Sequence, residues 1–314
     1  MTTGTARYQA KARDITRRFD NNFRASTPVY PKLCMIRGSD GYDEKYGWLG
    51  NFPQVREWIG DRQFEELRAF DYTLKNKDWE QSMPIDKNDI ADGRMGMYND
   101  AASQLGIEGG YHPDELLFDI IKAGTTGLCF DGQPFFDASH NFGANSDTPN
   151  QSNIHTATGT TTPSRPTLAE FEAAYNEALL LLQTFKSDNG KYFNRSIINN
   201  LDALTLAYPP GMNSVVDQYF RSTLVGGGNT NVIVQSVDAP NRLNTPHLID
   251  EPDAFYLAVT GGAFRPFIFQ DRMRMRRMVK GSDDIEEKHV KFMTWSRYNI
   301  GYLFWWLCVR VKFT

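Results

Sequence analysis

Cysteine is scarce in this 314-residue sequence, which contains only Cys34, Cys129 and Cys308. The three lie far apart and form no Cys-x-x-Cys pair, which excludes the usual patterns of a zinc cluster or a disulfide framework. We predict that they are small buried hydrophobic residues with inert thiols, in a reducing cytoplasm.

Long hydrophobic runs and a strong net charge are also missing. The longest apolar run, 302–309, is well short of the ~20 residues that a membrane helix needs. The N-terminal residues are polar and lack the apolar segment of a secretory signal, so we expect neither secretion by that route nor a membrane partner. A net charge of −4 gives no overall electrostatic reason to bind nucleic acid.

The common catalytic motifs do not occur. The sequence contains no His-Glu-x-x-His, Gly-x-Ser-x-Gly, Walker or dinucleotide-binding pattern, so we expect no enzyme, no cofactor and no metal. The only acid and histidine groups that could be assembled into a hydrolase site are His112 with Glu115, and Asp137 with His140, near Asp131. We interpret His112 and Glu115 as helix-start residues and Asp131 as a turn residue, and keep a hydrolase as the minor alternative.

The stretch YGWLGNFPQVREWIGDR, 46–62, has the composition of a contact segment. Aromatic side chains bury a large area, while Arg and Asp need polar partners, and no helix or strand periodicity covers the stretch. Such residues dominate interface hot spots. The predicted contacts between subunits are Trp48, Phe52, Arg56, Trp58, Asp61 and Arg62.

Positive charge is concentrated at the start of the chain, where residues 1–25 carry six basic side chains against two acidic ones. Either this segment contacts DNA or an acidic partner without sequence preference, or it is the solvated face of a helix. The candidates for such a contact are Arg7, Lys11, Arg13, Arg17 and Arg18.

A second basic group alternates with methionine. In a strand, Arg272, Arg274 and Arg276 would share one face, which favours either a DNA contact or internal pairing. The nearby counter-charges are Asp283, Asp284, Glu286 and Glu287.

Local signals predict a mixture of helices and strands. We expect a projecting strand pair over 63–84, a helix capped by Asp86, a second helix opening at His112-Pro113, a capping box from Thr167 to Glu170, and an exposed loop or insertion over 141–166. Further expected elements are strands at 128–130, 204–207, 232–237, 255–260 and 267–269, a short helix at 215–222, and a buried closing strand at 302–311.

Several blocks together resemble the Mu-like phage major head subunit family. Besides the stretch at 46–62, they are YTLKN at 72–76, HPDELLFDIIKAG at 112–124, LCFDGQPFFDASH at 128–140, FRPFIFQDR at 264–272 and YLFWWL at 302–307. They follow the family's order over most of the chain, with no visible match at 141–165.

This resemblance implies an α+β capsid protein of the Hong Kong 97-type fold. The implied parts are an N-terminal arm (1–50), an extended loop (51–85), a peripheral domain with a spine helix (86–200), an axial domain (201–265) and C-terminal strands that return to the peripheral domain (266–314). Lys75 and Asn76 would lie near the tip or return strand of the extended loop, as further contacts between subunits.

The implied function is the icosahedral shell of a phage head, made of pentamers and hexamers around double-stranded DNA. Implied partners are other copies, packaged DNA without sequence preference, and decoration, scaffold and portal proteins. The protein would be assembled in the host cytoplasm and reside in the virion. A tail or scaffold protein remains the other structural alternative.

Overall fold

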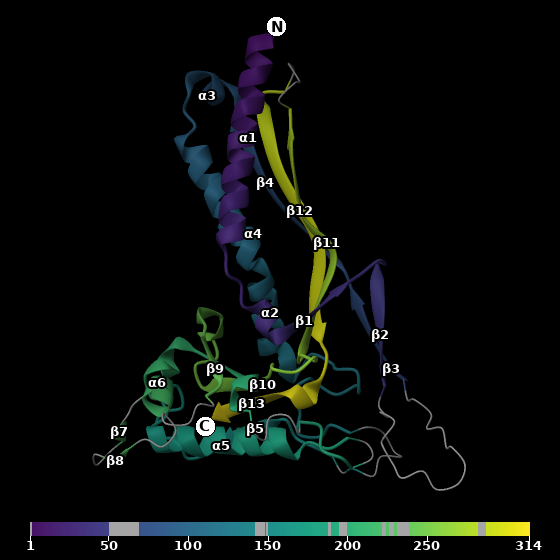
Figure 1. The fold of residues 1–314 in the computed structure, drawn as a ribbon, viewed down its shortest axis with the longest axis vertical. Helices are drawn as coiled ribbons and strands as arrows, with labels where there is room; N and C mark the ends of the chain where they lie inside the picture. The colour runs from purple at the N-terminus through teal and green to yellow at the C-terminus, as the bar shows by residue number, and fades with distance from the viewer. Residues whose placement is uncertain are drawn as a thin grey trace.

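The computed structural model describes residues 2–49, 69–141, 148, 150–187, 190–194, 200–221, 224–225, 229–230, 239–281 and 287–314. Over these residues the protein is elongated: two helices and a long sheet extend from a broader body that holds a second sheet (Figure 1). A separate two-stranded hairpin leaves the side of the long sheet.

The helices are α1 (Thr2–Ala25), α2 (Tyr30–Leu33), α3 (Lys87–Asp92), α4 (Gly96–Lys122), α5 (Leu168–Thr184) and α6 (Asn213–Arg221). The strands are β1 (Cys34–Gly38), β2 (Asp43–Leu49), β3 (Ala69–Lys75), β4 (Lys77–Asp86), β5 (Ile154–Ala157), β6 (Leu204–Tyr208), β7 (Leu224–Val225), β8 (Asn229–Thr230), β9 (Asn241–Asn244), β10 (Ala254–Val259), β11 (Phe267–Lys280), β12 (His289–Tyr302) and β13 (Cys308–Phe313).

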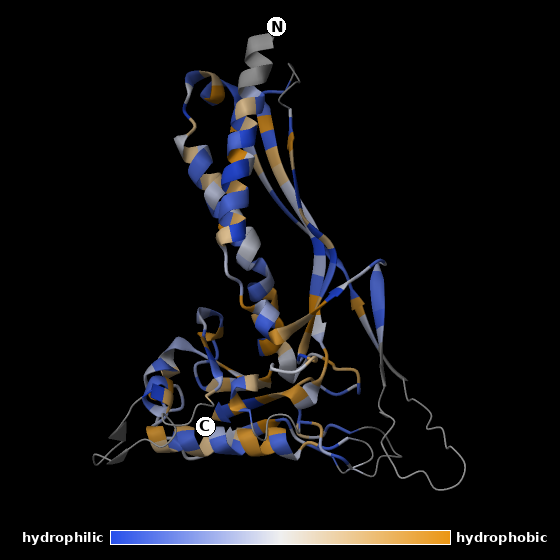
Figure 2. Ribbon diagram, in the orientation of Figure 1, coloured by the Kyte–Doolittle hydropathy of each residue, from blue (hydrophilic) through white to orange (hydrophobic). Residues whose placement is uncertain are grey.

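The long sheet has the strand order β1-β11-β12-β4, with α1 and α4 on one face. Alternate residues of β12 are buried toward the helices, as expected for a strand covered on one side. Hydrophobic and hydrophilic residues accordingly alternate along these elements (Figure 2). The small core between the layers consists of Ile15, Phe19, Ile85, Ile90, Met95, Ala102, Val290 and Phe292.

The body contains the larger core, built on a five-stranded sheet in the order β5-β13-β10-β6-β9. All six residues of β10 and all five of β6 are buried, as in strands covered on both faces. The capping box predicted at Thr167 and Glu170 is confirmed at the start of α5. Helix α6 confirms the helix expected near 215–222.

The prediction of separate helices at Asp86 and His112 is only half right. Asp86 caps the short α3 by accepting a hydrogen bond from the Asn88 N–H at 2.8 Å, and α3 ends at Gly93, whose φ is +79°. Helix α4 then runs without a break through Pro113, so the prediction that a helix opens at His112 is wrong. Packing on α1 and the body outweighs the hydrogen bond that proline removes.

Glycines allow α1 and α4 to approach closely. A Cβ at Gly106 would lie 2.5 Å from the Phe19 carbonyl oxygen, and one at Gly110 would overlap the Ser26 side chain. Glycine normally destabilises a helix interior by about 1 kcal/mol relative to alanine. Here it is required because the atoms facing Gly106 belong to the backbone of α1.

We therefore expect Gly106→Ala to destabilise the subunit by about 1–3 kcal/mol, although alanine favours helix, because α1 must shift to admit the methyl group. Chemical denaturation of dissociated subunits measures this change. The matched control is Gly96→Ala, since no atom lies within 4 Å of that Cβ. Equal stability of the two variants would show that the helices adjust freely.

Two strands are present as expected but pair differently. The strands predicted over 63–84 do not form one hairpin: β3 pairs with β2, whereas β4 pairs with β12 from Asp86↔His289 to Lys77↔Tyr298. The projecting hairpin is therefore β2–β3, and β4 is an edge strand of the long sheet. Long-range pairing decides this arrangement, and the polar, alternating sequence of 77–86 cannot specify its partner.

The interpretation of 141–166 as an exposed loop is also partly wrong. Strand β5 extends the five-stranded sheet beside β13, and Asn153 is completely buried. Its amide is hydrogen-bonded to the backbone on both sides, which is how a polar residue is accommodated in a core. Residues 142–147 and 149 lie outside the described part.

The closing segment is buried as predicted, but it is not one strand. Strand β12 ends at Tyr302, a turn at Trp305–Leu307 follows, and β13 then enters the other sheet. Residues 128–130 form only an isolated bridge, from Leu128 to Pro134, in place of the expected strand. The strands expected near 204–207, 255–260 and 267–269 are confirmed as β6, β10 and the start of β11, and 232–237 lies outside the described residues.

Candidate functional site

The β2–β3 hairpin leaves the long sheet from a hydrogen-bonded base. One carboxylate oxygen of Glu44 accepts hydrogen bonds from the Ser39 hydroxyl at 2.9 Å and from the Asp40 and Gly41 N–H groups at 2.9 and 3.1 Å. The bond from Ser39, followed by those from the backbone, lowers the pKa of Glu44 below its ordinary value. The base is thus ordered by contacts within one chain.

Asn76 belongs to this base. It is 6% exposed, and its Nδ2 donates to the Ser39 Oγ at 2.9 Å and to the Gly41 carbonyl at 3.0 Å. Its donors are thus used inside its own chain, and its role as a contact to another subunit stays a prediction. Lys75 is exposed and stays a contact candidate.

A buried glutamine fixes the hairpin to the long sheet. Gln270, on β11, accepts a hydrogen bond from the Tyr46 hydroxyl at 2.9 Å and donates to the Leu74 carbonyl at 3.2 Å, so it links both hairpin strands. The Tyr72 hydroxyl accepts from the Tyr302 N–H at 3.2 Å. Burial raises the pKa of Tyr46 and of Tyr72 to about 12, so both stay protonated at neutral pH.

Gln270 was not predicted from the sequence. The only signal was one amide in the apolar run FRPFIFQDR, which does not reveal which carbonyl it contacts.

One of the predicted contact residues of 46–62 lies in the described part of this hairpin. Trp48 is in β2, and its backbone is paired opposite Phe70. The others, Phe52, Arg56, Trp58, Asp61 and Arg62, lie outside the described residues. Their role as contacts stays a prediction.

The basic N-terminal segment is the helix α1. The side chains of Arg13, Arg17 and Arg18 are exposed, and Lys11 is half-buried. Arg17 has an exposed ion pair with Asp14 at 3.2 Å. The side chain of Arg7 lies outside the described part of the chain.

The second arginine group lies on a strand as predicted. Arg272, Arg274 and Arg276 are exposed on one face of β11. Arg272 pairs with Asp40 at 3.6 Å and Arg274 with Asp271 at 3.5 Å. Of the counter-charges expected from the sequence, Glu287 pairs with Lys291 at 3.0 Å, and Asp283, Asp284 and Glu286 lie outside the described residues.

The residues of the hydrolase alternative lie in two different surroundings. The Nδ1 of His112 is 2.7 Å from the Tyr298 hydroxyl beside Trp79, and burial lowers the His112 pKa. His140 is buried, with its Nδ1 2.6 Å from Asp131 and its ring stacked on Trp305.

The other two members form no hydrogen bond to either histidine among the described residues, although the Glu115 charge opposes the lowering of the His112 pKa by burial. Glu115 is exposed, and Asp137 accepts a hydrogen bond from the Ser139 N–H. Within the described residues, no group of three or more His, Cys, Asp or Glu could hold a metal ion. A search of the described helices for one long and apolar enough to cross a bilayer finds none.

Residues 9–164 and 242–314 match the protein family described as the Mu-like prophage major head subunit gpT. The chain belongs to this family. The matched range includes 141–164, where the sequence blocks had shown no resemblance, and the unmatched part is 165–241. The family match thus covers the long sheet and, in the body, the strands β5, β10 and β13, but not α5, β6 or α6.

Two curated relatives agree with this assignment. The chain is 35% identical over 122 residues to the major capsid protein of Escherichia phage Mu, covering 39% of this chain and 40% of the relative. It is 36% identical over 148 residues to the Mu-like prophage FluMu major head subunit of Haemophilus influenzae. This match covers 46% of this chain and 48% of the relative. The matched part is less than half the length of either relative.

The fold is that of phage capsids. The chain resembles the subunit in the procapsid of bacteriophage JBD30 with a TM-score of 0.58 and 22% identity, over 99% of this chain and 76% of that one. This α+β architecture confirms the Hong Kong 97-type capsid fold expected from the sequence.

Proposed function

We propose that this chain is the major capsid subunit of a Mu-like phage or prophage head, and that its copies form the pentamers and hexamers of an icosahedral shell around double-stranded DNA. Family membership carries the proposal, together with the capsid fold. The work of such a subunit is mechanical, without a catalytic site.

The geometry of the hairpin supports this proposal. Among the described residues, β2 and β3 pair with each other and are fixed to the long sheet near their attached ends, by Gln270 and the base at Glu44. A two-stranded hairpin is marginally stable alone in water. A neighbouring copy would complete it, so ordering and assembly would be coupled.

The parts of the subunit follow from these pairings. We propose β2–β3 with its connection, 43–75, as the extended loop, since β4 belongs to the long sheet. Helix α4 would be the spine of the peripheral domain, residues 201–265 would supply the axial domain, and α1 would face packaged DNA or an acidic partner. Scaffold, portal and decoration proteins would be further partners, with assembly in the host cytoplasm.

Assembly of the purified chain tests the proposal directly. Sedimentation velocity and negative-stain microscopy should show capsomers or closed particles. Tubes, rings or elongated species would favour the tail or scaffold alternative. A compact low-order oligomer under all assembly conditions would contradict a shell protein.

The predicted hot spot Trp58 gives a sharper prediction. Trp58→Ala should reduce particle yield more than it lowers the melting temperature of the dissociated subunit, because its aromatic area would be buried only between copies. Particle counts and thermal melting of the same preparation measure both effects. Tyr42→Ala is the control, since Tyr42 is an exposed aromatic residue at the hairpin base. Equal loss of both quantities in Trp58→Ala would show that Trp58 is a core residue.

A further inference from the structure

Helices α1 and α4 lie side by side, and their outward faces carry opposite charge. Arg13, Arg17 and Arg24 are exposed at positions i, i+4 and i+11, which places them on one stripe of α1. Ile15 and Phe19, which are buried, occupy the other side of that helix. This stripe is called the basic edge.

The exposed stripe of α4 is acidic. Asp100, Gln104, Glu108 and Glu115 are exposed at i, i+4, i+8 and i+15, and so share one face. Gly106 and Gly110, which contact α1, lie on the opposite side. Asp100, Glu108 and Glu115 form the acidic edge.

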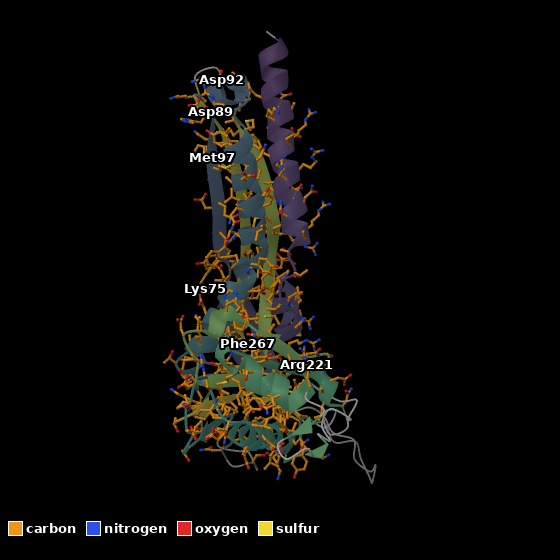
Figure 3. The ribbon with its side chains drawn as sticks, turned by 90° about the vertical axis from the view of Figure 1, so that its left-hand side faces the viewer. Lys75, Asp89, Asp92, Met97, Arg221 and Phe267 are labelled. Carbon is orange, nitrogen blue, oxygen red and sulfur yellow. The ribbon has the colours of Figure 1, made fainter. Side chains whose placement is uncertain are left out.

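The two edges face away from each other. Because α1 contacts α4 through Phe19 and Asn22, its arginines point away from α4. In Figure 3, nitrogen-tipped side chains project from the outer side of α1, and Asp89, Asp92 and Met97 lie on the other side of the molecule. The basic and acidic edges of one copy therefore cannot neutralise each other.

Most of these charges also lack partners in their own chain. Within the described residues, no ion pair involves Arg13, Arg24, Asp100, Glu108 or Glu115. Arg17 has only its exposed pair with Asp14, and Glu108 accepts an exposed hydrogen bond from the Gln104 side chain. By comparison, the Glu170 carboxylate on α5 accepts a hydrogen bond from the Thr167 N–H in the cap of its own helix. Exposed charges of this kind are available to a partner.

We propose that the basic edge of α1 in one copy docks against the acidic edge of α4 in the next copy around a capsomer. This inference rests on the shell function proposed above and names a pair of surfaces that hold neighbours together. Two different patches on one chain make a head-to-tail contact, which closes into a ring when the rotation between copies allows it.

Spacing as well as sign is complementary. Arg17 and Arg24 are seven residues apart, as are Glu108 and Glu115, so each pair spans about 10 Å along its helix. Each exposed ion pair contributes little by itself, but a set of them selects the partner and its register. Met97, 71% exposed at the start of α4, adds apolar area at the end of the acidic edge.

Charge reversal tests the proposal. A chain with Arg13→Glu, Arg17→Glu and Arg24→Glu, or one with Asp100→Lys, Glu108→Lys and Glu115→Lys, places like charges at every such contact. We expect the apparent association constant to fall about tenfold or more in each, and to recover partly at high salt. A chain that carries all six changes should assemble again, because reversed edges then meet reversed edges. Sedimentation velocity and particle counts are the measurements.

The control is Glu172→Lys with Glu177→Lys, which reverses two exposed charges on α5, away from both edges. Melting of dissociated subunits shows that each variant is folded, and the smaller set Arg24→Glu with Glu108→Lys repeats the test with less perturbation. Normal assembly of both triple variants would overturn the proposal. So would a folded chain with all six changes that does not regain assembly. Loss of packaged DNA with normal assembly in the arginine variant would make the basic edge a DNA contact instead. If the wild-type chain forms no shells at all, the proposed function fails, not this pairing alone.

Discussion

Asn153→Ala should cost about 3–5 kcal/mol of unfolding free energy. Asn153 is 0% exposed, and its Nδ2 donates to the Phe135 carbonyl at 2.7 Å and lies 3.3 Å from the carbonyls of Trp305 and Cys308. Its Oδ1 accepts from the Asp137 N–H at 2.9 Å. Alanine leaves these groups buried without partners, at about 1–3 kcal/mol each. Chemical denaturation of dissociated subunits measures the loss.

The neighbouring Asn150 provides the control. Its Nδ2 donates to the Ser139 hydroxyl at 2.7 Å in an exposed position, so Asn150→Ala should change stability by less than about 0.5 kcal/mol. Asn153→Asp should be at least as damaging as Asn153→Ala, since it keeps an acceptor but removes the donor and buries a charge. A small effect of Asn153→Ala would mean that water replaces the amide.

Elements whose boundaries depend on local chemistry were predictable. The caps at Asp86 and Thr167 satisfy N–H groups of their own helices, so a few consecutive residues contain the whole signal. The buried strands β6 and β10 were predictable for a similar reason, because an apolar run bounded by turn residues has few other structures available.

Elements that depend on distant partners were not predictable. The residues of β4 pair with those of β12, and nothing in 77–86 specifies a partner more than two hundred residues away. Pro113 gave a false helix start because the rule for proline describes an isolated helix end. In the folded chain, α1 and the body hold α4 continuous across it.

The candidate site shows the same division. The aromatic and charged composition of 46–62 predicts a contact segment, and this stays a prediction. The hydrogen bonds of the Asn76, Asn153 and Gln270 amides could not be predicted, because they depend on which carbonyls and hydroxyls surround each side chain in the fold. Charged stripes on α1 and α4 are visible in the sequence, but their placement on opposite edges requires the packing of the two helices.

Asp114→Ala is the second substitution for which we expect a large effect, about 2–4 kcal/mol. Asp114 is 3% exposed, and its carboxylate accepts from the Tyr30 N–H at 2.7 Å and from the Val29 N–H at 2.9 Å to each oxygen. It thereby joins the start of α2, and the strand β1 that follows, to α4. Alanine leaves two N–H groups unpaired. Denaturation of dissociated subunits measures the change, and Glu115→Ala, at the exposed next position, should have little effect on it.

A pH series separates the charge of Asp114 from its hydrogen bonds. Burial raises the pKa of Asp114 above its ordinary 3.8, against the opposing bonds from Val29 and Tyr30. The folded protein then holds the proton more tightly than the unfolded chain, so this group's contribution to stability declines as pH rises from 3.8 through the raised pKa. Asp114→Asn lacks the titration, so the advantage of wild type over this variant should shrink across that window and stay constant above it. A difference that grows with rising pH would show that the N–H bonds outweigh burial at this carboxylate.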